Sequence, residues 1–529
     1  MIPYLSLITF IPLLGAIIIL FLPNDKAIKQ FAIAWSIIPL VLATVAWATL
    51  SSWAPPYNFV YNACGVTIDS ASAGYTFGEC APWISTLGIQ YHLGADGLSM
   101  PLIWLTTLLT TLGLFYSAKV IQNRVKEFFA LFLLLEVGML GVFVSLDLFL
   151  FYVFWEIGLV PMYFLIGIWG HDTDRPQYAA IKFFMYTLAG SVFMLLGIIA
   201  LYLYSSPNTF DMTLLAANQA NMPFSKDVLI SSLAFLGFFL AFSIKMPLFP
   251  FHTWLPDAHT AAPTAGSVIL AGILLKLGGY GFFRILLPIF PQVSQQWAFW
   301  IGVLAVISIV YGALVAMAQT DFKRLVAYSS VNHMGFVILG FAAAAALTAE
   351  QMQNPHYINN GASAINGAVL AMFSHGVITG GLFFLVGMLY ERTHTRELAL
   401  FGGFGSQIPV YGALLLLTSF ASLGLPGLAG FVGEFMVMNG AYSTLTLLAF
   451  IAVWGIVFTA AYFLWKIIQK ILLGNVSEQW AKLPDLKGYE ILTLAPLAVL
   501  MFAIGLFPNW ILDTINTASI AILEYMKRM

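Results

Sequence analysis

The sequence predicts an all-α integral membrane protein with about fourteen transmembrane helices. Hydrophobic residues make up 60% of the 529 residues and charged residues only 8%. A soluble protein carries about 25% charged residues, so a soluble fold is excluded. Apolar stretches long enough to cross a bilayer follow one another along almost the whole chain. The net charge of −2 gives no reason to expect nucleic acid as a partner.

The expected spans are separated by short segments that are more polar or contain glycine and proline. They cover residues 4–22, 31–50, 99–118, 128–146, 147–169, 181–204, 227–255, 262–287, 297–317, 324–346, 366–389, 408–438, 444–470 and 489–508. The first span lacks the basic start and the cleavage site of a signal peptide, so we interpret it as a helix that the protein keeps. Residues 508–529 are weakly amphipathic and are expected at the membrane interface.

Lysine and arginine gather in alternate connecting segments, which predicts the orientation of the chain. These residues are Lys119, Arg124, Lys126, Arg175, Lys323, Arg324, Arg392, Arg396, Lys470, Lys482 and Lys487. The long segment 51–98 contains neither type. Basic loops stay on the cytoplasmic side, so the N-terminus and segment 51–98 are expected outside an inner (cytoplasmic) membrane. There Cys64 and Cys80 either form a disulfide or remain two loop thiols.

A weak internal repeat divides the middle of the chain. The run that starts at Glu156 resembles the run at His333, and the run at Phe183 resembles the run at Phe373. The division predicts an N-terminal unit (1–127), two repeats of five helices each (128–290 and 291–470), and a C-terminal helix with its tail (471–529). Since five is an odd number, the two repeats would be inverted in the membrane, as in many transporters.

Two of the spans contain helix-breaking residues near charged side chains. The seventh span carries Pro247 and Pro250 directly after Lys245, and the twelfth carries a glycine-rich run before Glu434. Proline removes a backbone donor and clashes with the preceding turn. Broken backbone at membrane depth is tolerated where it lines an enclosed or watery cavity. We therefore predict that helices 7 and 12 are discontinuous, either at a functional site or at a simple packing kink.

Glu156, Lys245, Lys276 and Glu434 each lie inside a predicted span. An ionisable group in the hydrocarbon region costs at least a few kcal/mol, so it is kept where it faces the protein interior. Such groups on several helices indicate a path for ions, most simply protons. Glu156 and Lys245 form either a permanent salt bridge or a pair that opens and closes while the lysine binds and releases a proton.

Further ionisable residues extend this line. Lys276 has no carboxylate in its own helix and suits the role of a proton carrier. His333 and His375, near the centres of neighbouring spans, act as proton relays, as packing residues, or as a pair of haem ligands. Other acidic and basic residues lie in or at the ends of spans (Glu136, Asp147, Lys182) or nearer the interfaces, where structural roles are expected (Asp96, Asp257, Lys466).

The cysteines and glycines of the chain indicate no iron–sulfur, zinc or dinucleotide site. The two cysteines form no CxxC pair, and no glycine-rich dinucleotide fingerprint follows a predicted strand. Any electron transfer must therefore take place in another chain.

Three motifs are similar to those of the antiporter-like subunits of respiratory complex I. They are Phe154-Trp-Glu-Ile-Gly-Leu-Val-Pro-Met-Tyr, Ala241-Phe-Ser-Ile-Lys-Met-Pro-Leu-Phe-Pro-Phe-His-Thr-Trp-Leu-Pro-Asp-Ala-His-Thr-Ala-Ala-Pro-Thr and Ser422-Leu-Gly-Leu-Pro-Gly-Leu-Ala-Gly-Phe-Val-Gly-Glu-Phe. The similarity runs from about residue 93 to about residue 470. Glu434, where sister subunits L and N usually carry lysine, resembles the subunit M branch, the counterpart of mitochondrial subunit 4.

The resemblance implies a proton channel driven by redox events elsewhere in NADH:quinone oxidoreductase. It implies proton-translocating roles for Glu156, Lys245, Lys276, His333, His375 and Glu434. It also implies that FMN, iron–sulfur clusters and quinone are bound by partner subunits, with subunits L and N as neighbours. Three alternatives remain open: an Mrp-type Na⁺/H⁺ antiporter subunit, the homologous subunit of a ferredoxin-driven photosynthetic complex, and a scaffold subunit that only holds its neighbours together.

Overall fold

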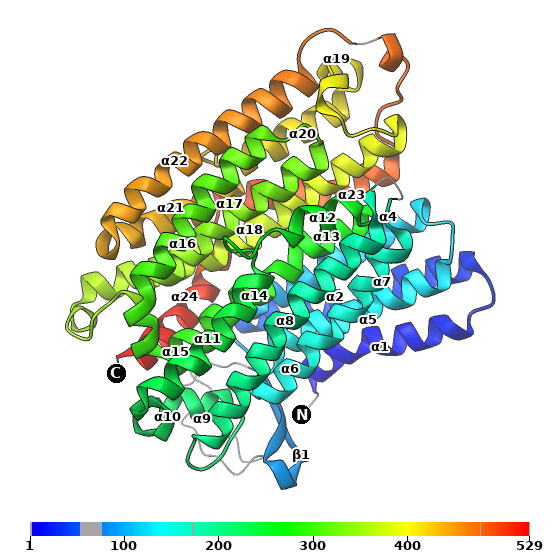
Figure 1. Cartoon of the computed structure of the whole chain (residues 1–529). Coiled ribbons are helices and arrows are strands. Elements are labelled where there is room, and N and C mark those ends of the chain that lie inside the picture. The colour runs from blue at the N-terminus through cyan, green and yellow to red at the C-terminus, as the bar shows by residue number, and fades with distance from the viewer. Residues whose placement is uncertain (1–2, 53–76, 172–173, 477, 528–529) are drawn as a thin grey trace.

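A computed structural model describes residues 3–52, 77–171, 174–476 and 478–527 of the chain. Within these residues, thirteen helices are long and apolar enough to cross a membrane. Two shorter helices, α20 (Pro409–Ser422) and α21 (Ala429–Thr444), occupy the remaining predicted span. The helices lie side by side in one bundle, with a small β-hairpin at one end and the short helix α19 (Phe404–Gln407) at the other (Figure 1). We call these the hairpin end and the α19 end.

The N-terminal half contains both long and short helices. They are α1 (Tyr4–Phe21), α2 (Asp25–Ser52), α4 (Met100–Val120), α5 (Val125–Val144), α6 (Leu148–Ile157), α7 (Leu159–Trp169), α8 (Pro176–Leu203), the short α9 (Met212–Ala217) and α10 (Pro223–Lys226), α11 (Val228–Lys245) and α12 (Trp254–Ala261). A continuous helix then spans residues 264–289. It comprises α13 (Thr264–Ile269), the π-helical η4 (Leu270–Leu274), α14 (Leu275–Gly281), the π-helical η5 (Phe282–Leu286) and α15 (Leu287–Ile289).

The C-terminal half contains longer helices. They are α16 (Pro291–Ala318), α17 (Phe322–Ala345), α18 (Pro355–Thr393), the short α19 (Phe404–Gln407), α20 (Pro409–Ser422), α21 (Ala429–Thr444), α22 (Thr446–Tyr462) with its π-helical continuation η8 (Phe463–Leu472), α23 (Gly488–Leu506) and α24 (Asn509–Met526). The last helix buries Ile511, Ile515 and Ile522 and packs across α18. The C-terminal segment is thus an integral part of the bundle.

The β-hairpin is a feature that the all-α prediction misses. Strand β1 (Phe77–Ile84) pairs antiparallel with β2 (Ile89–Ala95) inside the expected loop 51–98. Glu79 of β1 accepts a hydrogen bond from the backbone N–H of Leu5 at 2.7 Å, so the hairpin holds the start of α1. The predicted disulfide involves Cys64, which lies outside the described residues.

Asp147, which precedes α6, ties the same hairpin to the bundle and predicts a pH dependence. Its carboxylate accepts hydrogen bonds from Phe149 N, Leu150 N and Gln90 N at 2.9, 3.0 and 3.1 Å. Burial raises the pKa of Asp147 from 3.8 to about 6, against the lowering effect of these hydrogen bonds. A raised carboxyl pKa stabilises the fold below about pH 4 and loses that contribution as the pH rises through 6. Between pH 4 and 7, the wild type should therefore lose thermal stability relative to Asp147→Asn, and parallel melting curves would contradict this.

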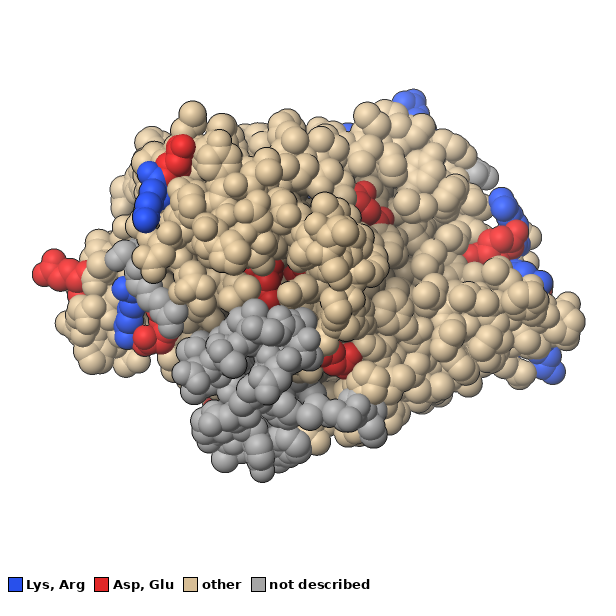
Figure 2. Space-filling model, turned by 90° about the horizontal axis from the view of Figure 1, so that it is seen from below, with Lys and Arg blue, Asp and Glu red and all other residues tan. Residues whose placement is uncertain are grey.

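The core lies around three central elements. Helix 264–289, α17 and α18 are almost entirely buried, whereas α1, α2, α8, α22 and α23 expose wide apolar faces. Figure 2, which looks at the molecule from below the view of Figure 1, shows few charged side chains on a largely uncharged surface. The protein therefore presents apolar side chains outward and keeps several charged groups inside, the arrangement expected in a bilayer.

Two helix interruptions lie next to Lys245 and Glu434. Helix α11 ends at Lys245 and α12 begins at Trp254, while α20 ends at Ser422 and α21 begins at Ala429. In the second gap, Gly424 and Gly427 have φ angles of +82° and +92°, which only glycine adopts without strain. A further break separates α6 from α7 at Gly158. The inverted relationship between the two repeats and the division into four units stay predictions.

Candidate functional site

Four ionisable side chains from four helices form a row in the core. Lys276 Nζ (α14) lies 2.6 Å from His375 Nδ1 (α18). The rings of His375 and His333 (α17) are 5.7 Å apart between centroids. His333 Nδ1 lies 2.7 Å from Glu434 Oε1 (α21). All four side chains are buried, with exposed fractions of 8% or less. The structure thus brings four of the six predicted site residues together.

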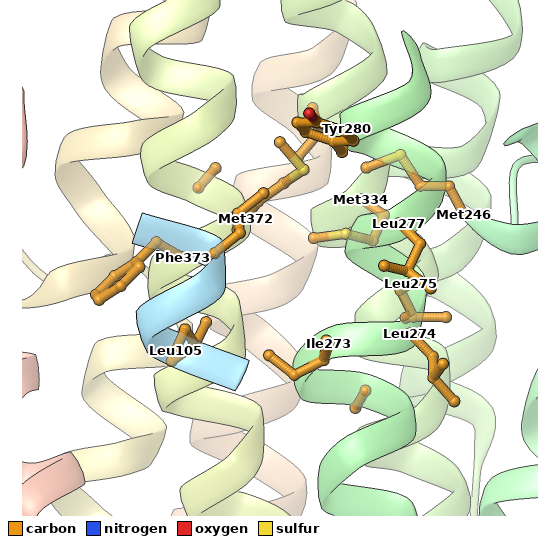
Figure 3. Close-up of a cluster of buried hydrophobic side chains, with 14 of the residues drawn as sticks. Leu105, Met246, Ile273, Leu274, Leu275, Leu277, Tyr280, Met334, Met372 and Phe373 are labelled. Atoms are coloured by element: carbon orange, nitrogen blue, oxygen red, sulfur yellow. The ribbon is translucent and has the colours of Figure 1, made fainter. Parts of the chain in front are cut away.

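The π-helical turn before Lys276 helps to position its ammonium group. Lys276 Nζ donates a second hydrogen bond to the carbonyl oxygen of Ala271, five residues earlier in η4. Apolar side chains surround this part of the helix, among them Leu275, Leu277 and Met372 (Figure 3). A buried charge without partners is costly in such low-dielectric surroundings, so His375 and the Ala271 carbonyl stabilise the charged form of Lys276. The side-chain partner of Lys276 is therefore a histidine from another helix, α18, and not a carboxylate of its own helix.

A small cavity adjoins the row between His375 and Glu434. Its volume is about 20 Å³, enough for a water molecule. The lining residues are His333, Ala371, Ser374, His375, Ile378, Thr379, Ser422, Gly430 and Glu434. Ser422 Oγ lies 3.2 Å from His333 Nε2. Sequence reasoning assigned no role to Ser422, Ser374 and Thr379, since serine and threonine are common in spans, although Ser422 begins the third motif.

Lys245 and Glu156 form a second group at the end of α11. Lys245 is buried, and its Nζ has no hydrogen-bond partner among the described residues. It lies 5.2 Å from the ring centroid of Trp155 and 5.9 Å from that of Phe183. Glu156 acts on it electrostatically, but no hydrogen bond or ion pair in the described part of the chain joins the two. A permanent salt bridge between them is therefore absent, and the pair stands open.

Two histidines that sequence reasoning did not assign are buried at the helix-7 break, His252 between α11 and α12 and His259 in α12. His252 and His259 are buried, and neither has a hydrogen-bond partner on its ring nitrogens among the residues described. The ring of His259 stacks on that of Phe383, with 4.7 Å between the centroids. Lys323 and Lys276 both interact electrostatically with His259. Both residues belong to the motif Phe-His-Thr-Trp-Leu-Pro-Asp-Ala-His, so the motif itself was the available signal.

The remaining ionisable residues predicted in or near the spans have mixed surroundings. Lys182 pairs with Asp257 at 2.6 Å, a partly buried contact at the α19 end. Glu136 is fully buried, and in the described residues its carboxylate has no hydrogen-bond partner. No group of three or more histidine, cysteine, aspartate or glutamate side chains in the described ranges is placed to hold a metal ion. The two histidines of the row are engaged with Lys276 and Glu434.

Comparison of the sequence and the structure with known proteins shows which family the chain belongs to. The family described as NADH:quinone oxidoreductase/Mrp antiporter, TM, matches residues 145–459. NADH-quinone oxidoreductase subunit M of Rickettsia conorii is 41% identical over 517 residues, which covers 97% of both chains. The chain belongs to the subunit M family of NADH-quinone oxidoreductase. Subunit M of Escherichia coli K12 is 43% identical over 446 residues, covering 83% of each chain.

Solved structures agree with membership of the subunit M family. A chain of respiratory complex I from Thermus thermophilus is similar with a TM-score of 0.83 and 30% identity, over 99% of both chains. A chain of the Mrp complex from Dietzia sp. DQ12-45-1b has a TM-score of 0.81 at 20% identity, over 99% of this chain and 100% of that one. The second similarity shows a shared fold.

Proposed function

We propose that this chain is a proton-translocating membrane subunit of an NADH:quinone oxidoreductase. The observation that carries the proposal is the buried row Lys276–His375–His333–Glu434, in which neighbouring groups that bind protons lie within 2.6 to 5.7 Å. Histidine titrates near neutral pH and relays protons. The adjoining cavity provides room for a water molecule that bridges His375 to Glu434. The names of the relatives support the same function.

Glu156 and Lys245 would control entry to this row. At about 4 Å and an effective dielectric constant of about 20, their attraction is about 4 kcal/mol, so closing the pair favours a charged lysine. Opening the pair leaves an ammonium in apolar surroundings, which favours loss of its proton. Moving one charge costs about 2.3 kcal/mol per 100 mV. Opening and closing of the pair can therefore move a proton against a membrane potential.

The assembly around the chain follows from the same proposal. The chain itself supplies no redox cofactor, and FMN, iron–sulfur clusters and quinone are bound by partner subunits. Antiporter-like subunits L and N flank it, and lipid covers its apolar outer faces. The chain spans an inner (cytoplasmic) membrane with its N-terminus outside, and its two repeats (128–290 and 291–470) are inverted relative to each other.

An Mrp-type Na⁺/H⁺ antiporter subunit is the second candidate, favoured by the fold shared with the Mrp complex. A ferredoxin-driven complex is the third. Native gels of mildly solubilised membranes separate the candidates, with the chain located by mass spectrometry. We expect it in a band of several hundred kDa with NADH dehydrogenase activity. A smaller assembly without that activity, together with Na⁺ flux in vesicles, would favour the antiporter.

Replacement of Lys245 by alanine tests the proposed control of entry. We expect the assembled complex to keep its subunits and to lose NADH-driven proton pumping, because Lys245 is a buried cation on which Glu156 acts electrostatically. The measurement is pH-dependent dye quenching in vesicles, and Lys470→Ala, at an exposed position, serves as the control. Undiminished pumping by the Lys245→Ala complex would contradict the proposed role of this residue.

A further inference from the structure

A second line of polar groups leaves Lys276 in the direction of the hairpin end. Tyr280 lies one turn after Lys276 on the same face of α14, and Arg284 follows in η5. Arg284 Nε donates a hydrogen bond to Tyr280 Oη at 3.0 Å. Arg284 Nη2 forms an ion pair with Asp96 Oδ1 at 2.5 Å. This line connects the row to a different part of the molecule from Glu434.

The line ends at a second cavity. Asp96 follows strand β2, which places the ion pair at the hairpin end of the bundle. A cavity of about 20 Å³ adjoins the pair, lined by Asp96, Arg284, Thr213, Tyr525 and apolar side chains. Asp96 and Arg284 are 3% and 6% exposed. Tyr280 and this ion pair thus follow Lys276 along the described helix, and the pair adjoins a pocket large enough for water.

Neither Arg284 nor Tyr280, the two groups nearest to Lys276 in this line, is suited to carrying protons. Arginine stays charged at any relevant pH and has no acceptor atom. The hydroxyl of Tyr280 donates to the carbonyl oxygen of Phe143 at 3.0 Å, so its own proton is already engaged. A fixed positive charge in a narrow, low-dielectric passage repels a proton or any other cation. The chemistry of the line is that of a barrier.

A purely structural role explains only part of the arrangement. Asp96 accepts hydrogen bonds from Leu98 N and Ser99 N at 3.0 and 3.1 Å, so it shapes the turn before α4 without any cation. Burying an ion pair brings little net stability compared with apolar residues of similar volume. Arg284 lies one turn beyond the buried Tyr280 and two turns beyond Lys276. Stability alone therefore does not explain a charged side chain at this position.

We propose that Arg284, held by Asp96 and Tyr280, is an electrostatic seal that blocks proton exchange between Lys276 and the hairpin end. The seal rests on the proposed function, since it protects a proton carried by Lys276. Without it, Lys276 would exchange protons with that end at any time, and the membrane gradient would leak through the row. Arg284 is a positioning and barrier residue and takes part in no proton transfer.

The test measures passive proton permeability of vesicles that contain the whole complex, without NADH. An imposed pH difference should decay severalfold faster with Arg284→Gln, which keeps a hydrogen-bonding side chain and removes the charge. Adding Lys276→Met to Arg284→Gln should restore the slow decay, because the leak passes through Lys276. The control is Arg324→Gln, an exposed arginine at the α19 end. An unchanged decay with Arg284→Gln, or a leak that persists in the double variant, would overturn the seal.

A second variant covers the case of failed assembly, and the leak measurement is independent of the pumping test. If Arg284→Gln alone does not assemble, Asp96→Asn with Arg284→Gln leaves no unpaired charge, and the same faster decay is expected. The measurement needs no redox turnover, so its result is separate from the pumping test on Lys245. A complex that pumps normally and leaks normally without the arginine contradicts the seal and leaves the proposed function standing.

Discussion

Exchange of Lys276 for methionine should lower proton pumping through this chain by about 100-fold in a complex that still assembles. Lys276 is the one member of the row that bonds to both His375 and the backbone of its own helix. Without the amine, a proton at this point has to enter an apolar region at a cost of about 3 kcal/mol. Methionine keeps the length of the side chain and fits surroundings that already contain methionine (Figure 3).

The pumping assay compares initial rates of dye quenching after addition of NADH, normalised to the amount of assembled complex. Lys226→Met, at an exposed position in α10, makes the same chemical change away from the row. Its pumping should equal that of the wild type. Full pumping by the Lys276→Met complex would show that protons do not pass along the row, and would leave its histidines as packing residues.

Replacement of Gly138 by leucine should greatly lower the amount of this chain that is found in the assembled complex. A Cβ atom at Gly138 would lie 2.5 Å from Gly158 N and 2.7 Å from Gly158 Cα, so α5 must move away from the α6–α7 break. Overpacking a tight contact costs about 1–3 kcal/mol, and more where backbone is in the way. The clash lies two residues from Glu156, so any chain that still assembles should also pump poorly.

Quantitative mass spectrometry of the native complex measures this effect. Gly488→Leu is the matched control, because a Cβ atom at Gly488 meets nothing within 4 Å. Wild-type amounts of the Gly138→Leu chain in the complex, with normal pumping, would contradict the close approach of α5 to the break.

The predicted spans and the buried charges follow from local properties of the chain. Hydropathy over about 20 residues reports the thickness of the bilayer, so the expected spans agree with the observed helices within several residues. The main differences are at helix ends, as in α18, which begins at Pro355 where a span from 366 was expected. Glu156, Lys245, Lys276 and Glu434 stood out because a charge in an apolar run is rare, whatever lies around it.

Composition and hydropathy alone determined that this is a multi-spanning helical membrane protein with a few charges in its core, because both depend on residues close together in the chain. Only the tertiary structure decided which charges meet. Lys276 finds His375, and His333 finds Glu434, across about 100 positions of sequence, since hydrogen bonds depend on distances between helices. The contact of Glu79 with the start of α1, the open Glu156–Lys245 pair and the Arg284–Asp96 contact have the same origin. Each joins segments whose approach is set by the packing of the whole bundle, and no local pattern records it.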